Sequence, residues 1–187
     1  MLLKNTLRTY GWVSITLHWF SSLVILALFA LGWWMVDLDY YSVWYTDAPH
    51  YHKSVGLLLA ALTLMRLGWK VSQVSPQGIG KMWEKNAAKF AHIILYIGLI
   101  SLFLTGYLIS TADGRGIDIF NWLTLPSMGK WFDNQEDIAG DIHEYLAYVL
   151  IAIVVIHAAA AGKHHFINKD STLKRMLKPL YHNKDPL

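Results

Sequence analysis

The sequence predicts an all-α membrane protein, a bundle of four transmembrane helices with both termini in the cytoplasm. Of its 187 residues, 55% are hydrophobic and only 16% are charged, whereas about 25% of residues in soluble domains are charged. Apolar runs occur at about 15–36, 52–69, 90–110 and 142–161, and runs of about 20 such residues can cross a bilayer. Lysine and arginine are also distributed unequally between the two sets of loops.

The first apolar run, 15–36, follows Lys4 and Arg8. We interpret it as a retained span rather than a signal peptide, because it exceeds a typical signal-peptide core and acidic residues replace a cleavage site. An aromatic and acidic loop, Tyr40–His50, precedes the second run, 52–69, which is the shortest.

A polar connector, Val71–Asn86, leads to the third run. The longer loop Thr111–Ile138 begins with Asp113–Gly116, where a turn is expected. Its apolar residues are expected to form a short segment at the membrane interface before Pro126; they are Ile117, Phe120, Trp122, Leu123 and Leu125. The fourth run precedes a basic tail, 163–187, and we expect the whole chain, 1–187, to be one membrane domain.

The basic residues orient the chain. With four spans, thirteen lysines and arginines lie on the side of the termini and only Lys53, Arg115 and Lys130 lie on the other. The positive-inside rule then places both termini in the cytoplasm. A soluble helical protein does not explain four spans with this bias, and we expect a lipid bilayer as partner and no nucleic acid.

Histidines recur at matched depths in these spans. His143 and His157 are 14 residues apart, so on one helix they share a face about 21 Å apart. The same offset joins His18 to Gly32, His52 to Arg66, and His92 to Gly106. The outer level therefore holds Gly32, His52, Gly106 and His143, and the inner level holds His18, Arg66, His92 and His157. Ionisable side chains inside a span are costly and usually functional.

The outer level suits a haem. His52 and His143 would be its axial ligands, and Gly32 and Gly106 would let the flat porphyrin approach the backbone. The chain has no cysteine, which excludes covalent c-type attachment and leaves b-type haem. The glycines could instead be helix contacts and the histidines hydrogen-bonded packing residues. Zinc is disfavoured because the histidines lie at two depths rather than around one point.

The inner level offers three histidines. His18 and His157 come from the first and last spans, which leaves His92 as a ligand, a propionate or quinone contact, or a packing residue. Arg66 fits a haem propionate or a quinone oxygen, or it extends to inner headgroups. Arg66, His92, Lys163 and His164 together exceed what haem ligation needs, so they predict a quinone site at this level.

Several motifs carry a resemblance to a known family. The chain resembles the bacterial cytochrome b561 family and is similar to the cytochrome b subunits of formate dehydrogenase and nickel–iron hydrogenase. The matching residues are His18-Trp19, His52–Gly56, Ala91-His92, Leu95-Tyr96, Thr105–Ser110, His143, His157, Lys163–Phe166, Lys169-Asp170 and Leu173–Met176. The motifs cover nearly the whole chain, and their joint order and spacing are specific.

The resemblance implies a multi-pass protein of the bacterial inner membrane with two haem b groups. It implies His18 and His157 as ligands of the inner haem, and electron exchange with the quinone pool, through ubiquinone or menaquinone. We therefore expect a di-haem electron carrier. The alternatives are a superoxide:ubiquinone oxidoreductase, and a membrane anchor that passes electrons to or from a periplasmic protein.

Charge bears on these alternatives. The outer side carries ten acids and three bases, a formal charge of −7, and the inner side carries thirteen bases and three acids, +10. An acidic face repels superoxide and attracts a neutral or cationic donor. The sequence thus favours a periplasmic protein, docked on the Thr111–Ile138 loop, as the electron donor.

Overall fold

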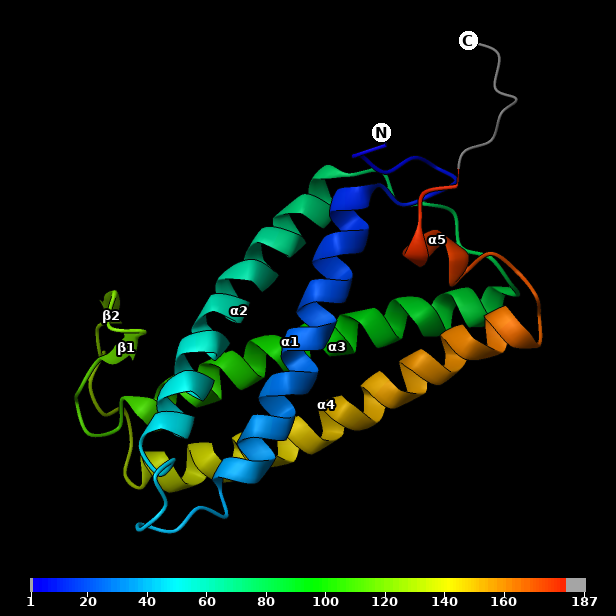
Figure 1. The fold of residues 1–187 in the computed structure, drawn as a ribbon. Helices are drawn as coiled ribbons and strands as arrows, with labels where there is room; N and C mark the ends of the chain where they lie inside the picture. Colours follow the sequence, from blue (N-terminus) through cyan, green and yellow to red (C-terminus); the bar gives the residue numbers. More distant parts are fainter. Residues whose placement is uncertain (1, 181–187) are drawn as a thin grey trace.

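The computed structural model describes residues 2–180, which form four long helices, one short helix and a two-stranded hairpin (Figure 1). The elements are α1 (Trp12–Met35), α2 (Asp47–Ser72), α3 (Met82–Ser110), β1 (Ile117–Ile119), β2 (Leu123–Leu125), α4 (Gln135–Phe166) and α5 (Lys174–Leu177). All four long helices are long and apolar enough to cross a membrane. The predicted four-helix membrane bundle is therefore confirmed.

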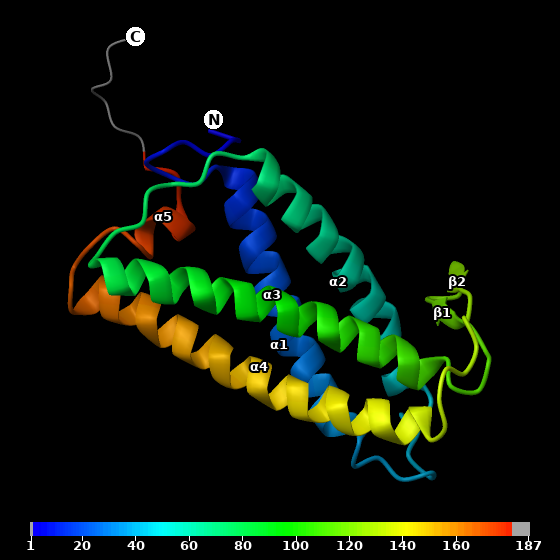
Figure 2. The ribbon, with the colours of Figure 1, turned by 180° about the vertical axis from the view of Figure 1, so that it is seen from behind.

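The long helices pack as two pairs, α1 with α2 and α3 with α4 (Figures 1 and 2). The pairs diverge toward one end of the molecule, where α5 lies (Figures 1 and 2). We call this end the termini side; it comprises residues 2–11, 73–81 and 167–180. The opposite end, residues 36–46 and 111–134, is the hairpin side.

A small residue allows α3 and α4 to approach closely. A Cβ added to Gly98 would lie 2.9 Å from Leu150 Cδ1, so a side chain here would displace the end of the Leu150 side chain. Because lipid tails are as apolar as leucine, helices in a membrane associate largely through such close packing. Leu150 lies midway along α4 between His143 and His157, so this contact sits between the two predicted levels.

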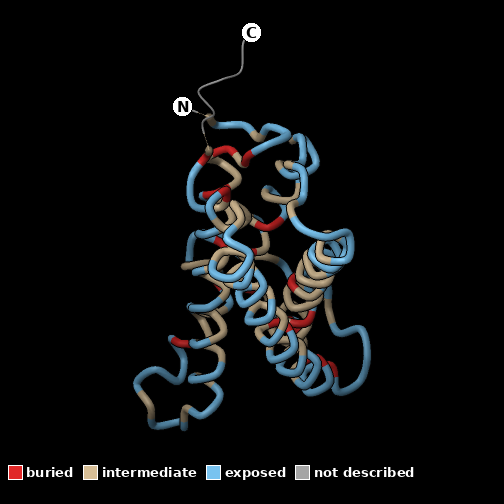
Figure 3. The backbone as a smooth tube through the Cα atoms, turned by 90° about the vertical axis from the view of Figure 1, so that its right-hand side faces the viewer, coloured by how far each residue is buried: buried red, intermediate tan, exposed pale blue. Residues whose placement is uncertain are grey.

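The outer surfaces of the helices are apolar and exposed. Most helical positions are exposed or half-buried, and few are buried (Figure 3). On α1, for example, Leu23 is 64% exposed and Trp33 is 63% exposed. A soluble protein rarely leaves apolar surface on this scale in water, whereas hydrocarbon solvates it.

The loop between α3 and α4 departs from the expected short interfacial segment, because its apolar residues form a β-hairpin. β1 and β2 pair antiparallel with Ile117 opposite Leu125. Phe120, Asn121 and Trp122 connect them. The Trp122 amide donates to the Ile119 carbonyl at 2.9 Å, and the positive φ values of Phe120 and Asn121, 47° and 59°, are those of the central residues of a type I′ turn. The alternation of Ile117-Asp118-Ile119 and of Leu123-Thr124-Leu125 has the period of a strand, which the sequence interpretation did not use.

Buried polar contacts fasten the termini side. The Arg175 side chain, only 7% exposed, donates to the carbonyls of Arg8 at 3.1 Å and Gln77 at 3.0 Å. The amide of Leu180 donates to Thr9 Oγ1 at 3.1 Å. These bonds join the segment before α1, the α2–α3 connector and the segment after α4. The remainder of the predicted basic tail, 181–187, lies outside the described residues.

Candidate functional site

The four residues predicted at the outer level converge near the hairpin side. The ring centres of His52, on α2, and His143, on α4, are 6.3 Å apart with an interplanar angle of 72°. A Cβ on Gly32 would lie 3.1 Å from His52 Cε1, and one on Gly106 would lie 3.3 Å from His143 Cε1. Each glycine thus lets an imidazole lie against helix backbone. We call these four residues the hairpin-side level.

Backbone and hydroxyl groups orient the His143 ring. Its Nδ1 lies 3.1 Å from the carbonyl oxygen of Leu102 and 3.0 Å from Thr105 Oγ1. A carbonyl only accepts, so Nδ1 carries the proton and Nε2 is the nitrogen free to bind a metal. Thr105 was quoted within a motif but given no role; its signal is a hydroxyl beside Gly106 in an apolar run.

His52 presents a different situation. Its Nδ1 is buried, and no hydrogen-bond partner is found for it among the described residues. Buried polar atoms nearly always have a hydrogen-bond partner. A buried nitrogen without one is therefore consistent with a ring that binds a ligand.

The residues predicted at the inner level also converge, closer to the termini side. The ring centres of His18 and His157 are 6.4 Å apart, and those of His92 and His157 are 5.2 Å apart. Arg66 Nη2 lies 2.9 Å from His18 Nδ1. A guanidinium can only donate, so His18 Nδ1 is the acceptor here. We call His18, Arg66, His92 and His157 the termini-side level.

Two histidine pairs have the spacing of axial ligands. An imidazole nitrogen binds a metal ion at about 2 Å, so two imidazoles on opposite sides of one iron have ring centres about 6 Å apart. The separations of 6.3 Å for His52–His143 and 6.4 Å for His18–His157 fit this value. The 5.2 Å between His92 and His157 is too short for it.

Two cations surround Tyr96 at the termini-side level. Lys70 Nζ lies 4.6 Å and Arg66 Cζ lies 5.7 Å from the centre of the Tyr96 ring. Within residues 2–180, neither cation forms an ion pair with a carboxylate. Cations inside a membrane protein are costly and usually functional. Although Arg66 also contacts His18, the two adjacent positive charges suit an anionic group of a ligand. Lys70 was counted only as an inner charge in the sequence.

Lys163 and His164 make their contacts elsewhere. Lys163 Nζ pairs with Glu84 Oε1 at 2.7 Å, and His164 Nδ1 lies 2.6 Å from Asp170 Oδ2. Glu84 was not singled out in the sequence, and Asp170 was quoted within a motif but given no role. The available signal was their rarity, because they are two of only three acids among the residues assigned to the basic side.

A serine beside the hairpin-side level fastens the hairpin to α2. Ser54 is fully buried; its Oγ donates to the Asp118 carbonyl at 3.2 Å and accepts from the Phe120 amide at 3.1 Å. Phe120 also packs against the rings of His50 and Tyr51. The hairpin is thereby held two residues from His52 along α2.

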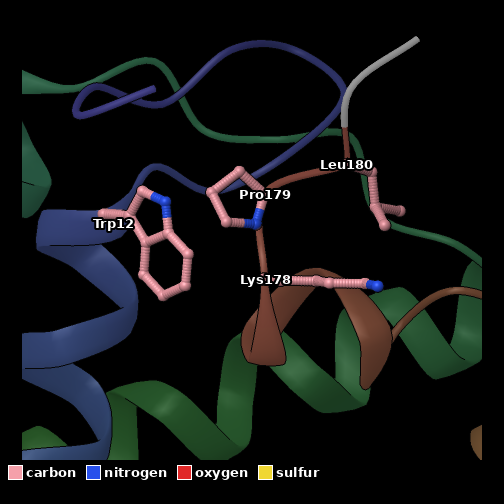
Figure 4. Close-up of a pocket in the computed structure, with 4 residues that line it drawn as sticks. All are labelled: Trp12, Lys178, Pro179 and Leu180. Carbon is pink, nitrogen blue, oxygen red and sulfur yellow. The ribbon is translucent and has the colours of Figure 1, made fainter. Parts of the chain in front are cut away.

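Two pockets lie outside these clusters. One of about 380 Å³ is lined by Trp12 of α1 and by Lys178, Pro179 and Leu180 (Figure 4). The other, of about 220 Å³, lies between α2 and α3 and is lined by Ala60, Thr63, Leu64, Ile100, Phe103 and Leu104. Neither is lined by a predicted site residue.

Sequence comparisons relate the chain to known proteins. Residues 9–179 match the family described as prokaryotic cytochrome b561. The chain is 42% identical over 179 residues to "Cytochrome b561 homolog 2" of Escherichia coli (strain K12), covering 95% of each chain. It is 27% identical to "Cytochrome b561 homolog 1" of the same organism, covering 91% of this chain and 98% of that protein. It is 25% identical to "Probable superoxide oxidase CybB" of Yersinia pestis, covering 91% and 96%.

Proposed function

Because the chain belongs to the prokaryotic cytochrome b561 family, we propose that it is a di-haem cytochrome that carries electrons across the inner membrane and exchanges them with quinone. Family membership makes it a multi-pass electron-transfer protein of the bacterial inner membrane that binds haem b. The number of haems, their ligands and the quinone are parts of the proposal.

In this proposal the termini side faces the cytoplasm and the hairpin side faces the periplasm. The support is the charge distribution, because thirteen of the sixteen lysines and arginines lie on the side of the termini. The hairpin-side level is then the outer level and the termini-side level is the inner one.

The observation that carries the proposal is the presence of two histidine pairs with ligand spacing at two depths. His52 and His143 would hold the outer haem, with Gly32 and Gly106 admitting the porphyrin. Leu102 and Thr105 would keep His143 in the tautomer that binds through Nε2. In His52, Nδ1, for which no partner is found within residues 2–180, would be the nitrogen that does not bind iron.

His18 and His157 would hold the inner haem, with His92 beside them as a propionate or quinone contact. A ring that binds iron through Nε2 carries its proton on Nδ1, so His18 could no longer accept from Arg66. Arg66 would then pair with a haem propionate, the type of bidentate contact that arginine makes with carboxylates. Lys70, on the same helix, would add a second positive charge.

When bound, the b haems supply one-electron carrier chemistry. His52 with His143, and His18 with His157, would each hold one group by two imidazoles, which favours electron transfer over oxygen binding. The apolar helices would bury the groups, which controls access of water and tunes the redox potential.

We place quinone exchange at the inner level, near Arg66, His92, Lys163 and His164. The support is that these polar side chains exceed the needs of haem ligation. Ubiquinone and menaquinone are both compatible with this chemistry.

Two alternatives have a specific observation behind them. The 25% identity to a protein named as a probable superoxide oxidase supports superoxide:ubiquinone oxidoreductase activity. The formal charge of −7 on the outer side assigned from the sequence instead supports a periplasmic protein partner, for which this chain would be a membrane anchor and electron carrier. We favour the partner, because superoxide is an anion.

Anaerobic redox titration of the purified protein tests the proposal. We expect two haem b groups per chain, each with its own midpoint potential, and rapid reoxidation of the reduced protein by a short-chain ubiquinone or menaquinone. One haem per chain would contradict the two-level assignment. Two haems that no quinone reoxidises would contradict the exchange.

A further inference from the structure

A histidine–aspartate pair lies just beyond the predicted inner haem. His164 lies in the last turn of α4, and Asp170 follows the helix. His164 Nδ1 and Asp170 Oδ2 are 2.6 Å apart. The other carboxylate oxygen of Asp170 accepts from the Thr172 amide at 2.8 Å. The His164 side chain is 13% exposed and that of Asp170 is 18% exposed, so both are mostly buried yet within reach of solvent.

The pair is aligned with the candidate ligands. His164 follows His157 by seven residues, just as Leu150 and then His157 follow His143. Seven residues are nearly two helical turns, so these side chains share one face and successive ones are about 10 Å apart along the axis. His164 thus lies between the inner level and the termini side, on the face that holds the proposed ligands.

A second ion pair, between Glu84 and Lys163, lies near His164, with Gly80 between Glu84 and the His164 ring. Gly80 has φ +97°, and a Cβ there would lie 3.2 Å from His164 Cε1 and 2.6 Å from Glu84 Oε2. Glu84, 9% exposed at its side chain, pairs with Lys163. The charged groups around His164 are therefore Asp170 from the segment after α4, Glu84 from α3, and Lys163 from its own helix.

Burial tends to raise the pKa of Asp170, but hydrogen bonds from His164 and Thr172 outweigh it and hold this pKa below its ordinary value. The carboxylate therefore stays ionised at neutral pH. An ionised carboxylate at Nδ1 fixes the tautomer and orientation of the ring and leaves Nε2 as the nitrogen that can contact a ligand.

We infer that His164, positioned by Asp170, donates a proton to a quinone oxygen when quinone is reduced at the inner level. This rests on the proposed quinone exchange. Reduction of a quinone to a quinol adds two electrons, which the haems supply one at a time, and two protons, one on each oxygen. The N–H bond of the His164 imidazolium breaks as an O–H bond forms, and cytoplasmic water reprotonates the ring. The second proton reaches the other oxygen from the same water.

The competing explanation is that the pair only shapes the turn after α4, since the Asp170 amide also donates to the His164 carbonyl at 3.1 Å. A structural role predicts lost binding or lost haem when His164 is changed. A proton-donating role predicts a slower reaction with binding retained, and restoration of the rate by an added acid of the same kind.

The first test uses His164→Ala in the full haem-loaded protein. We expect reoxidation by ubiquinone-1 to slow about 100-fold, with the haem spectrum and midpoint potentials unchanged. Binding of ubiquinone-1 to the oxidised protein, measured by quenching of tryptophan fluorescence, should change by less than about 3-fold. Added imidazole should restore much of the rate. His165→Ala, which alters the adjacent histidine that packs on Phe166, is the matched control and should keep the wild-type rate.

The second test uses Asp170→Asn, with Asp133→Asn on the hairpin side as control. In Asp170→Asn the reoxidation by ubiquinone-1 should slow while the haem spectrum and quinone binding are retained, because the neutral amide no longer holds the His164 ring in one tautomer. Asp133→Asn should keep the wild-type rate.

These measurements distinguish failure of the proposed quinone exchange from failure of the proposed proton donation by His164. If the wild-type protein binds haem but does not exchange electrons with quinone, the proposed function is wrong and the inference falls with it. If the wild type exchanges electrons and His164→Ala does so at the same rate, the inference alone is overturned. A slow His164→Ala protein with weakened quinone binding and no response to imidazole also overturns it, in favour of the structural role.

Discussion

A backbone carbonyl determines which nitrogen of His143 is available. The Leu102 carbonyl oxygen lies 3.1 Å from His143 Nδ1 and also accepts from the Thr105 hydroxyl at 3.1 Å. The resulting Nδ1–H leaves Nε2 for iron, and the 6.3 Å separation from His52 leaves room for it. His18 differs because its Nδ1 accepts from Arg66, so ligation there must be accompanied by a change of partner for the arginine.

At this scale the ligand assignment is directly testable. His52→Ala and His143→Ala should each lower haem content from two groups per chain to one, because a single imidazole no longer holds the outer haem. His92→Ala should retain both haems, since its ring lies too close to His157 to bind the same iron from the opposite side. Pyridine haemochrome quantification measures the content. Loss of a haem from His92→Ala, with none from His18→Ala, would show that the inner pair is misassigned.

The charge on Arg66 should set the potential of the inner haem. Reduction adds an electron, which a nearby positive charge stabilises, so Arg66→Gln should lower the inner midpoint potential on the order of 50 mV. The outer potential should barely move, because the outer level lies about 21 Å away along the helix. Spectroelectrochemical titration measures both. Arg115→Gln, at an exposed loop arginine paired with Asp113, is the control, and an unchanged inner potential in Arg66→Gln would argue against the propionate contact.

At the scale of elements, the β-hairpin depends on α2 for its position. It has only two strands, and an isolated two-stranded hairpin is marginally stable in water. The fully buried Ser54 supplies two hydrogen bonds to it, and Tyr107 OH, near the end of α3, donates to the Pro126 carbonyl at 2.9 Å. Helices on both sides therefore hold the α3–α4 loop over the hairpin-side level.

Ser54→Ala should loosen this hairpin without removing haem. The substitution deletes two bonds and leaves the Phe120 amide without its acceptor, a loss of about 1–2 kcal/mol. Amide hydrogen exchange of residues 117–125 should therefore accelerate about 10-fold, measured by mass spectrometry. Ser72→Ala, which removes an exposed hydroxyl on the same helix, serves as control. Unchanged exchange in Ser54→Ala would mean that ring packing alone holds the hairpin.

At the scale of the whole molecule, charge divides the protein in two. The outer side assigned from the sequence has a formal charge of −7 and the inner side has +10. Such fields change encounter rates with charged partners by roughly 10-fold or more, and salt screens them. Local ion pairs modify this pattern. The hydrogen bond from Arg115 lowers the pKa of Asp113, and the same bond raises the pKa of Arg115. The charge of Arg115 is therefore neutralised by Asp113.

The charge distribution predicts slow reduction by superoxide. Stopped-flow mixing at varied salt should give a rate well below the diffusion limit that rises with ionic strength, because salt screens repulsion between an anion and an acidic face. A cationic or neutral redox protein should show the opposite or no dependence. A superoxide rate near the diffusion limit that falls as salt increases would demonstrate positive steering and favour the superoxide oxidase alternative.

The sequence by itself determined the spans and the grouping of residues by depth. A helix rises by a constant amount per residue and turns by a constant angle, so the recurring offset of 14 residues translates into two levels on one face without knowledge of any contact. The apolar runs predicted all four long helices, although α3 begins at Met82 and α4 at Gln135, well before the apolar runs. Polar residues at these ends remain helical because they lie outside the apolar stretch that hydropathy detects.

Only the tertiary structure decided which groups meet across helices. It distinguished His18 from His92 by their distances to His157, joined Asp170 to His164, and seated the hairpin on Ser54. Such contacts depend on how each helix is rotated and tilted against its neighbours and on the path of the loops. Many side chains pack together to set these variables, and no local pattern of residues encodes them.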